Sequence, residues 1–179
     1  MKTFAAIVLG FISSLSFAQL PVQCSSETEI LKAKGDGAKI IIEKAYSTLF
    51  HAQVFASRAI GEAGAPTSAC WALTVLVKYD PEALKRLTEC LSYIEQPEQK
   101  LYALTAMFAL DPKTAERWPI SSFPASLRDG SVHTMDGCIY SGASFEDALT
   151  EVYHSGASGY LFEELPTIYQ TTDVARHEE

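Results

Sequence analysis

The stretch WALT at residues 71–74 leads after five residues to Asp80-Pro81, and YALT at residues 102–105 leads after the same gap to Asp111-Pro112. Proline disfavours helical geometry in the residue before it, so each Asp-Pro pair is expected to end a helix. Proline also fits the first turn of a following helix, with the aspartate as its N-cap. The repeated phrase therefore predicts two copies of a unit made of a helix, an Asp-Pro turn and a second helix.

The segment after Asp80-Pro81 has the spacing of an amphipathic helix, because its apolar positions recur at steps of three and four residues. These positions are Ala83, Leu84, Leu87, Cys90, Leu91 and Ile94. One helical hairpin cannot bury its apolar face alone, so neighbouring hairpins must stack. We therefore expect a mostly α-helical, single compact domain over residues 19–170, built from such hairpins.

These features resemble the HEAT-like helical repeats of about 31 residues. The resemblance covers residues 68–118 and rests on the two Asp-Pro pairs, Leu87, Leu91, Gln96-Pro97, Lys100 and the small-residue helix around Ala103. It implies a scaffold that binds other proteins along a curved surface. A likeness of fold transfers no active site.

The N-terminus has the pattern of a secretory signal peptide over residues 1–18. Lys2 supplies the positive start, residues 4–15 are apolar but short for a membrane span, and Ser16 and Ala18 are the small residues before the expected cleavage site. We expect an exported chain, in a bacterial periplasm or the medium, without a membrane span. Residues 171–179 are polar and are expected to form a flexible tail.

The chain is acidic, with a formal net charge of −8. Negative charge disfavours binding to nucleic acid or to an anionic membrane surface, because both are themselves negative. The charge could suit a basic partner protein, although solubility is its simpler explanation. We therefore expect any partner to be another protein and not nucleic acid.

Four cysteines in an exported chain suggest two disulfides. If the two helices fold back at Asp80-Pro81, then Cys70 and Cys90 lie at equal height across the hairpin. The expected pairs are therefore Cys70–Cys90 and Cys24–Cys138. In the first pair the two helices are expected to bring the Cα atoms close enough for a disulfide. These bridges would staple the domain.

The flanking segments are assigned from their spacing. For residues 39–45 the spacing does not decide between a helix and a short β segment at Ile40–Ile42. Residues Tyr46 to Ile60 are expected to be helical, with His51 in a structural role. Ser144 to His154 is predicted as a helix that Ser144 caps. Residues 119–143, with their prolines and glycines, are interpreted as a long connection.

The long connection contains the candidate site of this sequence, at His133, Asp136 and Cys138. These residue types serve zinc and thiol chemistry. The alternative is a loop that a Cys138 disulfide ties down, with His133 exposed, and it is favoured because a disulfide removes the thiolate. No phosphate-binding glycine loop, His-Glu-x-x-His or Cys-x-x-Cys motif occurs. No cofactor or metal is therefore expected.

Three functions remain open from the sequence. The favoured one is an exported, non-enzymatic helical-repeat protein that binds another protein. A narrower version is an inhibitor or immunity-type protein of the envelope that neutralises a toxin or hydrolase. The third is a hydrolase or metal-dependent enzyme that uses the loop from His133 to Cys138.

Overall fold

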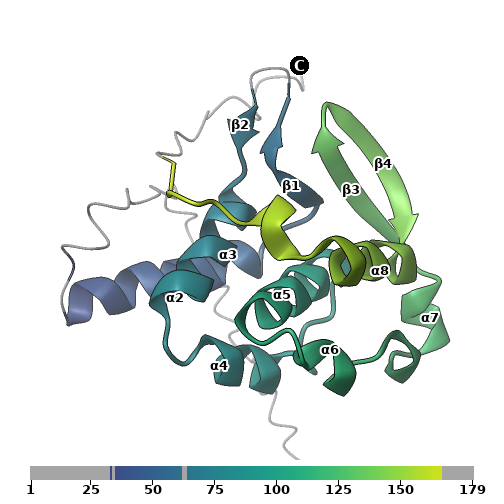
Figure 1. Ribbon diagram of the computed structural model, residues 1–179, viewed down its shortest axis with the longest axis horizontal. Coiled ribbons are helices and arrows are strands. Elements are labelled where there is room, and N and C mark those ends of the chain that lie inside the picture. Colours follow the sequence, from purple (N-terminus) through teal and green to yellow (C-terminus); the bar gives the residue numbers. More distant parts are fainter. Residues whose placement is uncertain (1–32, 34, 62–63, 167–179) are drawn as a thin grey trace, which may run out of the picture.

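The computed structural model describes residues 33, 35–61 and 64–166 (Figure 1). Its elements in chain order are α2 (Asp36–Leu49), β1 (Phe55–Ile60), β2 (Ala65–Pro66), α3 (Ser68–Tyr79), α4 (Ala83–Cys90), α5 (Pro97–Leu110), α6 (Thr114–Arg117), the 3-10 helix η1 (Ile120–Ser122), α7 (Ala125–Arg128), β3 (Ser131–Gly137), β4 (Ile139–Ser144), α8 (Phe145–Ser155) and the 3-10 helix η2 (Ala157–Tyr160). The chain is thus a mixed α/β protein. The expectation of a mostly α-helical fold is wrong.

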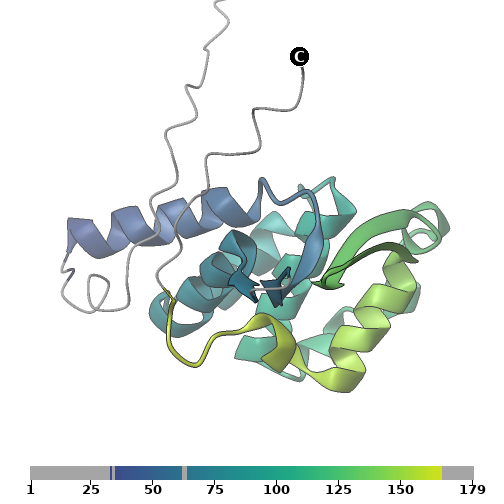
Figure 2. The same cartoon turned by 90° about the horizontal axis from the view of Figure 1, so that it is seen from above.

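The four strands form one mixed sheet in the order β2-β1-β3-β4. β1 and β3 are parallel, with Phe55 opposite Thr134, and the two outer strands pair antiparallel with their neighbours. A parallel pair requires a crossover connection, and here it contains the helices from α3 to α7. Figures 1 and 2 show the sheet beside a helical body in which α5 is central.

The hydrophobic core is centred on α3 and α5, the two helices that carry the repeated phrase. Trp71 and Tyr102 occupy equivalent positions and are fully buried. α3 packs against α2 and α5, whereas α4 packs against α5. Both central helices end at the aspartate of an Asp-Pro pair, Asp80 or Asp111, which confirms the predicted ends. The next helices begin later than expected, so neither aspartate is their N-cap.

The N-terminal third differs from the sequence prediction. The β segment considered at Ile40–Ile42 is helical and belongs to α2, and the helix expected from Tyr46 to Ile60 ends at Leu49. Helical spacing was correct up to this point, but Phe55–Ile60 pairs with a strand that lies far along the chain. That pairing is nonlocal, so local spacing did not reveal it.

The predicted disulfides are also wrong, because Cys70, Cys90 and Cys138 are all free thiols. Cys70 is fully buried, and its thiol donates a hydrogen bond to the backbone oxygen of Ala56, with Sγ and O 3.2 Å apart. It therefore faces β1 and not α4. Because α4 packs against α5, the two cysteines do not lie across one hairpin.

The C-terminal helix is predicted correctly, since α8 covers Phe145–Ser155 and Ser144 caps it. The Ser144 hydroxyl accepts the backbone N–H of Asp147 at 3.0 Å. The expected signal segment at 1–18, Cys24 and the tail at 171–179 lie outside the described residues. Within those that are described, none of the helices combines the length and apolar character that crossing a membrane requires.

Candidate functional site at the β3–β4 hairpin

His133 lies on β3 and is held by Glu98, a residue of the first turn of α5. Pairing between β1 and β3 begins only at Thr134, so no strand lies beside His133 on that side. The Glu98 carboxylate fills this position, because its Oε1 accepts the backbone N–H of His133 at 3.0 Å. Glu98 is 5% exposed, so the carboxylate is a buried anchor between α5 and the hairpin.

The same carboxylate oxygen also orients the His133 ring, since Nδ1 lies 3.0 Å from Oε1. A carboxylate oxygen acts as the acceptor, so the hydrogen belongs on Nδ1 and the lone pair of the neutral ring on Nε2. The His133 side chain is 58% exposed. Its ring stacks beside that of Tyr140 on β4, with centroids 6.0 Å apart. The pair therefore offers one oriented imidazole to the solvent.

The structure does not assemble the three-residue site that the sequence suggested. His133 and Asp136 are three positions apart on one strand, so their side chains point to opposite faces of the sheet. Burial raises the pKa of the Tyr160 hydroxyl, and the charges of Glu151 and, to a smaller extent, Asp136 add to the rise. Cys138 is an exposed thiol at the turn. No cluster of three or more metal-ligating side chains occurs among the described residues.

Glu98 is the site residue that the sequence analysis missed. It follows Pro97, which the sequence analysis used only as part of the resemblance to HEAT-like repeats. An acidic residue in the first turn of a helix is common because it suits the positive end of the dipole. Its burial beside His133, 35 positions away, depends on the packing of α5 against the sheet. No local signal in the sequence distinguishes it from an exposed cap residue.

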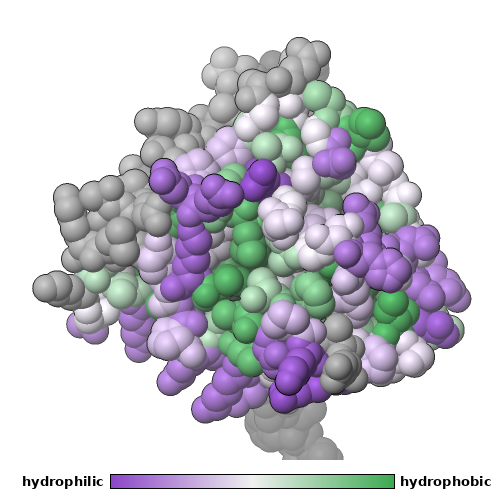
Figure 3. All heavy atoms as spheres, in the orientation of Figure 1, coloured by the Kyte–Doolittle hydropathy of each residue, from purple (hydrophilic) through white to green (hydrophobic). Residues whose placement is uncertain are grey.

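β4 forms the outer edge of the sheet and is exposed along most of its length. Ile139 is 69% exposed and Tyr140 is 60% exposed, so two adjacent large apolar side chains lie on this edge. Figure 3 shows hydrophobic surface over the end of this hairpin. The strand contains no charged residue and no proline, the usual protections of an edge.

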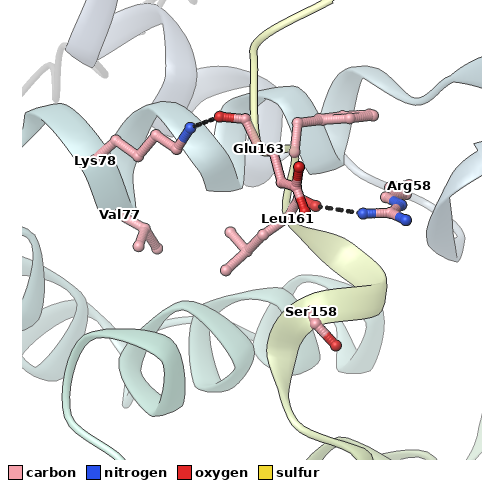
Figure 4. Close-up of a pocket in the computed structure, with 7 residues that line it drawn as sticks. Arg58, Val77, Lys78, Ser158, Leu161 and Glu163 are labelled. Carbon is pink, nitrogen blue, oxygen red and sulfur yellow. Dashed lines mark hydrogen bonds between the residues drawn. The ribbon is translucent and has the colours of Figure 1, made fainter.

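A second feature is a cavity of about 310 Å³ beside the C-terminal segment (Figure 4). Lys78 donates to the backbone oxygen of Glu163, and Arg58 donates to that of Leu161 at 3.3 Å. The backbone N–H of Phe162 donates to Thr74 Oγ1 at 3.0 Å. Both cations are thus engaged with the main chain, and we interpret the cavity as part of the attachment of this segment to α3.

Comparison with protein-family models, with curated proteins and with solved structures found no match to this chain. The resemblance to HEAT-like repeats therefore stays a prediction.

Proposed function

We propose that this chain is an exported, non-enzymatic protein-binding protein whose β4 edge pairs with an extended segment of a basic partner protein. The observation that carries the proposal is the unprotected edge of Ile139–Ser144, with two large apolar side chains exposed on it. A strand at the edge of a sheet presents unpaired N–H and C=O groups, to which an extended peptide can add a further strand.

The hydrogen-bond pattern identifies which backbone groups face outward. The N–H of His133 points away from β4, because it donates to Glu98. His133 lies opposite Gly142, and in an antiparallel ladder such pairs alternate with hydrogen-bonded ones. Gly142 and Tyr140 therefore direct their N–H and C=O groups to the outside. A partner strand would bond to these two residues.

The charge of the molecule favours a basic partner over a second copy of the chain. Asp136 lies opposite Ile139 at one end of β4, and Glu146 and Asp147 follow its other end in α8. Two copies, each with a net charge of −8, would repel one another. A segment that alternates apolar and basic side chains would contact Tyr140 and place its cations near these acids, of which Glu146 also pairs with Arg128 at 3.5 Å.

The hairpin is anchored, which lowers the ordering cost of binding. Val132 of β3 is fully buried in the core, and Glu98 fixes the neighbouring His133. The alternative enzyme lacks geometric support, since His133, Asp136 and Cys138 do not meet. An envelope inhibitor is a narrower form of the same proposal and would use the same edge.

The test uses fluorescent, end-capped peptides in which apolar residues alternate with lysine, and matched peptides with glutamate in place of lysine. We expect anisotropy titrations to show saturable binding of the lysine peptides only. The variant Tyr140→Pro loses both the ring and the outward N–H, whereas Tyr140→Ala loses only the ring. Tyr93→Ala removes another exposed tyrosine, 82% exposed and outside the hairpin, and is the control.

Tyr140→Pro should weaken binding by about tenfold or more relative to Tyr140→Ala, because it removes a main-chain hydrogen bond of the added strand. Tyr93→Ala should bind as the parent does. Equal binding of lysine and glutamate peptides, or equal affinities of the proline and alanine variants, would overturn the proposal. A dimer in sedimentation that dissociates in Tyr140→Pro would instead assign the edge to a second copy.

A further inference from the structure

The face of the β3–β4 hairpin that carries His133 has a gap in β4. His133 lies directly opposite Gly142, so both residues belong to the same face of the sheet. Gly142 has no side chain, and the nearest residue of β4 toward its start on this face is Tyr140. A Cβ atom at Gly142 would lie 3.3 Å from Ser131 Oγ. The space over Gly142, which we call the Gly142 gap, therefore leads from the free edge to His133 and is bordered by the Ser131 hydroxyl.

The His133 ring presents a hydrogen-bond acceptor beside this gap. Its Nδ1 donates to Glu98 Oε1 at 3.0 Å, which leaves the lone pair of the neutral ring on Nε2. Among the described residues Nε2 has no hydrogen-bond partner, and 58% of the side chain is exposed. The Glu98 carboxylate is buried and places a negative charge behind the ring. An acceptor with a negative charge behind it favours a cationic donor.

An added strand would bring one of its side chains to the gap. The N–H and C=O groups of Gly142 point outward, so an antiparallel strand can form a hydrogen-bonded pair at this residue. The side chain opposite Gly142 then lies on the face of His133, two strand spacings or about 10 Å from it. A lysine has a flexible four-carbon stem, so its ammonium can pass over Gly142 and reach the ring. The exposed Tyr140 ring offers an apolar surface to the stem.

The acceptors at the gap suit lysine better than arginine. His133 Nε2 and Ser131 Oγ are two separate acceptors on side chains two positions apart on β3. A lysine ammonium has three donors that rotate about the stem. Arginine holds its donors in a planar fork that fits a single carboxylate or phosphate. Two separate acceptors therefore match the ammonium.

We propose that the Gly142 gap is a specificity site for one lysine of the partner strand, whose ammonium donates to His133 Nε2 and Ser131 Oγ. This inference rests on the proposed function, since it assigns the register in which a strand adds to the same edge. The other cations of the partner would meet exposed acids, and exposed ion pairs contribute little to affinity. One lysine should therefore contribute more than the rest.

The test compares two fluorescent, end-capped peptides that alternate apolar residues with threonine and differ only at one central alternating position. One peptide has lysine there, and the other has norleucine, which keeps the four-carbon stem without the ammonium. Anisotropy titrations at about pH 8, where histidine is ordinarily neutral, should show about tenfold tighter binding of the lysine peptide. The physical reason is that a hydrogen bond from a charged donor is the stronger kind.

His133→Phe and Gly142→Val remove the contact in two different ways. His133→Phe keeps a ring beside Tyr140 but loses the acceptor Nε2. Gly142→Val keeps the outward N–H but fills the gap, and the φ of Gly142 lies outside the left-handed region, so a side chain fits the backbone there. In both variants we expect the two peptides to bind within about twofold of each other. His154→Phe, which replaces an exposed histidine near the end of α8, is the control and should keep the full preference for lysine.

The outcomes separate this inference from the proposed function. A lysine preference that persists in both His133→Phe and Gly142→Val would overturn the inference alone, as long as Tyr140→Pro still weakens binding to the edge. Equal binding of the lysine and norleucine peptides to the parent chain would also overturn the inference alone. If the parent chain binds no lysine peptide at all, both the inference and the proposed function fail.

Discussion

The two copies of the repeated phrase are alike in their local bonds. In the first copy Asp80 Oδ1 accepts the N–H of Glu82 at 2.9 Å, and in the second Asp111 Oδ1 accepts that of Lys113 at 3.1 Å. The threonines of both copies also match, since each hydroxyl donates to the backbone oxygen four positions earlier. These bonds join residues that are close in sequence, so equal sequence gives equal geometry.

The copies differ in the bonds that cross the fold. Asp80 is 7% exposed, its Oδ2 accepts the Tyr46 hydroxyl of α2 at 2.8 Å, and Arg86 lies 3.8 Å away. Asp111 is partly exposed and follows the helix that leads to the surface turn before α6. The same dipeptide is therefore a junction of three helices in one copy and a local turn in the other.

The aromatic position of the second copy also bonds across the fold. Tyr102 of the second copy bonds to both backbone groups of Ala56, since its hydroxyl accepts the N–H at 2.8 Å and lies 3.2 Å from the oxygen. β1 pairs with β2 only at Ala59 and Ile60, so the tyrosine replaces a strand beside Ala56. Trp71, its counterpart, is equally buried. The long-range bonds of a position are therefore set by what packs against it, not by the repeated phrase itself.

The largest contrast is expected between Asp80→Ala and Asp111→Ala. Asp80→Ala removes the acceptor of the Tyr46 hydroxyl and the buried partner of Arg86. This loss should lower the free energy of unfolding by about 3 kcal/mol. Asp111→Ala loses one local bond and should cost about 1 kcal/mol or less. Urea unfolding of both variants measures the difference. Equal losses would mean that the Asp-Pro turn alone carries the stability.

Tyr102→Phe tests the aromatic position of the second copy. It keeps the ring but removes the hydroxyl from two buried backbone groups of Ala56, so we expect a loss of about 2 kcal/mol. Tyr153→Phe is the control, because that hydroxyl makes one bond to the backbone oxygen of Trp118 at a half-buried site. Its expected loss is about 1 kcal/mol or less. Hydrogen exchange at Ala56 should accelerate only in Tyr102→Phe, and unchanged protection there would refute the assigned role.

Thr74→Val and Thr105→Val sharpen the comparison at the threonine position. Thr74 Oγ1 also accepts the N–H of Phe162 from the C-terminal segment, and the first variant leaves this N–H without its acceptor. We expect Thr74→Val to cost about 1.5 kcal/mol and Thr105→Val about 0.5 kcal/mol. The exchange rate of the Phe162 amide distinguishes the two, since it should rise in Thr74→Val alone.

The last contrast concerns the effect of pH on Cys70, the residue before Trp71. The second copy has Leu101 at the position that corresponds to Cys70. Burial raises the pKa of the Cys70 thiol from 9.0 to about 11. Between these values the unfolded chain loses the proton first, so stability falls as pH rises. Ionisation of the Cys70 thiol in the unfolded chain should lower the free energy of unfolding by about 1.4 kcal/mol at about pH 10.

Cys70→Ala is the control for this loss, because it removes the thiol but keeps the buried tyrosines. Burial also raises the pKa of Tyr102 well above its usual value, so some alkaline loss remains in the variant. Urea unfolding from pH 8 upward should show a shallower decline for Cys70→Ala. Parallel pH profiles would mean that the thiol ionises equally in both states.

The sequence by itself determined the parts of the fold that short-range interactions fix. Helical ends at Asp80 and Asp111 and the cap at Ser144 were predicted correctly, because proline geometry and capping bonds involve residues within a few positions. His133 was also named as a candidate from its residue type, and its role stays a prediction. Its partner Glu98 was not, because a helix-start acid has the same local sequence whether it is buried or exposed.

Only the tertiary structure decided the sheet and everything that depends on it. Phe55 and Thr134 become neighbours through the packing of the helices between them, and no local spacing records that pairing. The same packing turns Cys70 toward Ala56, which rules out the expected disulfide with Cys90. Side-chain direction in a strand alternates, so the sheet also separated His133 from Asp136 and left β4 as a free edge. Contacts between distant segments decide whether a segment such as Phe55–Ile60 becomes a helix or a strand, where its local sequence is compatible with both.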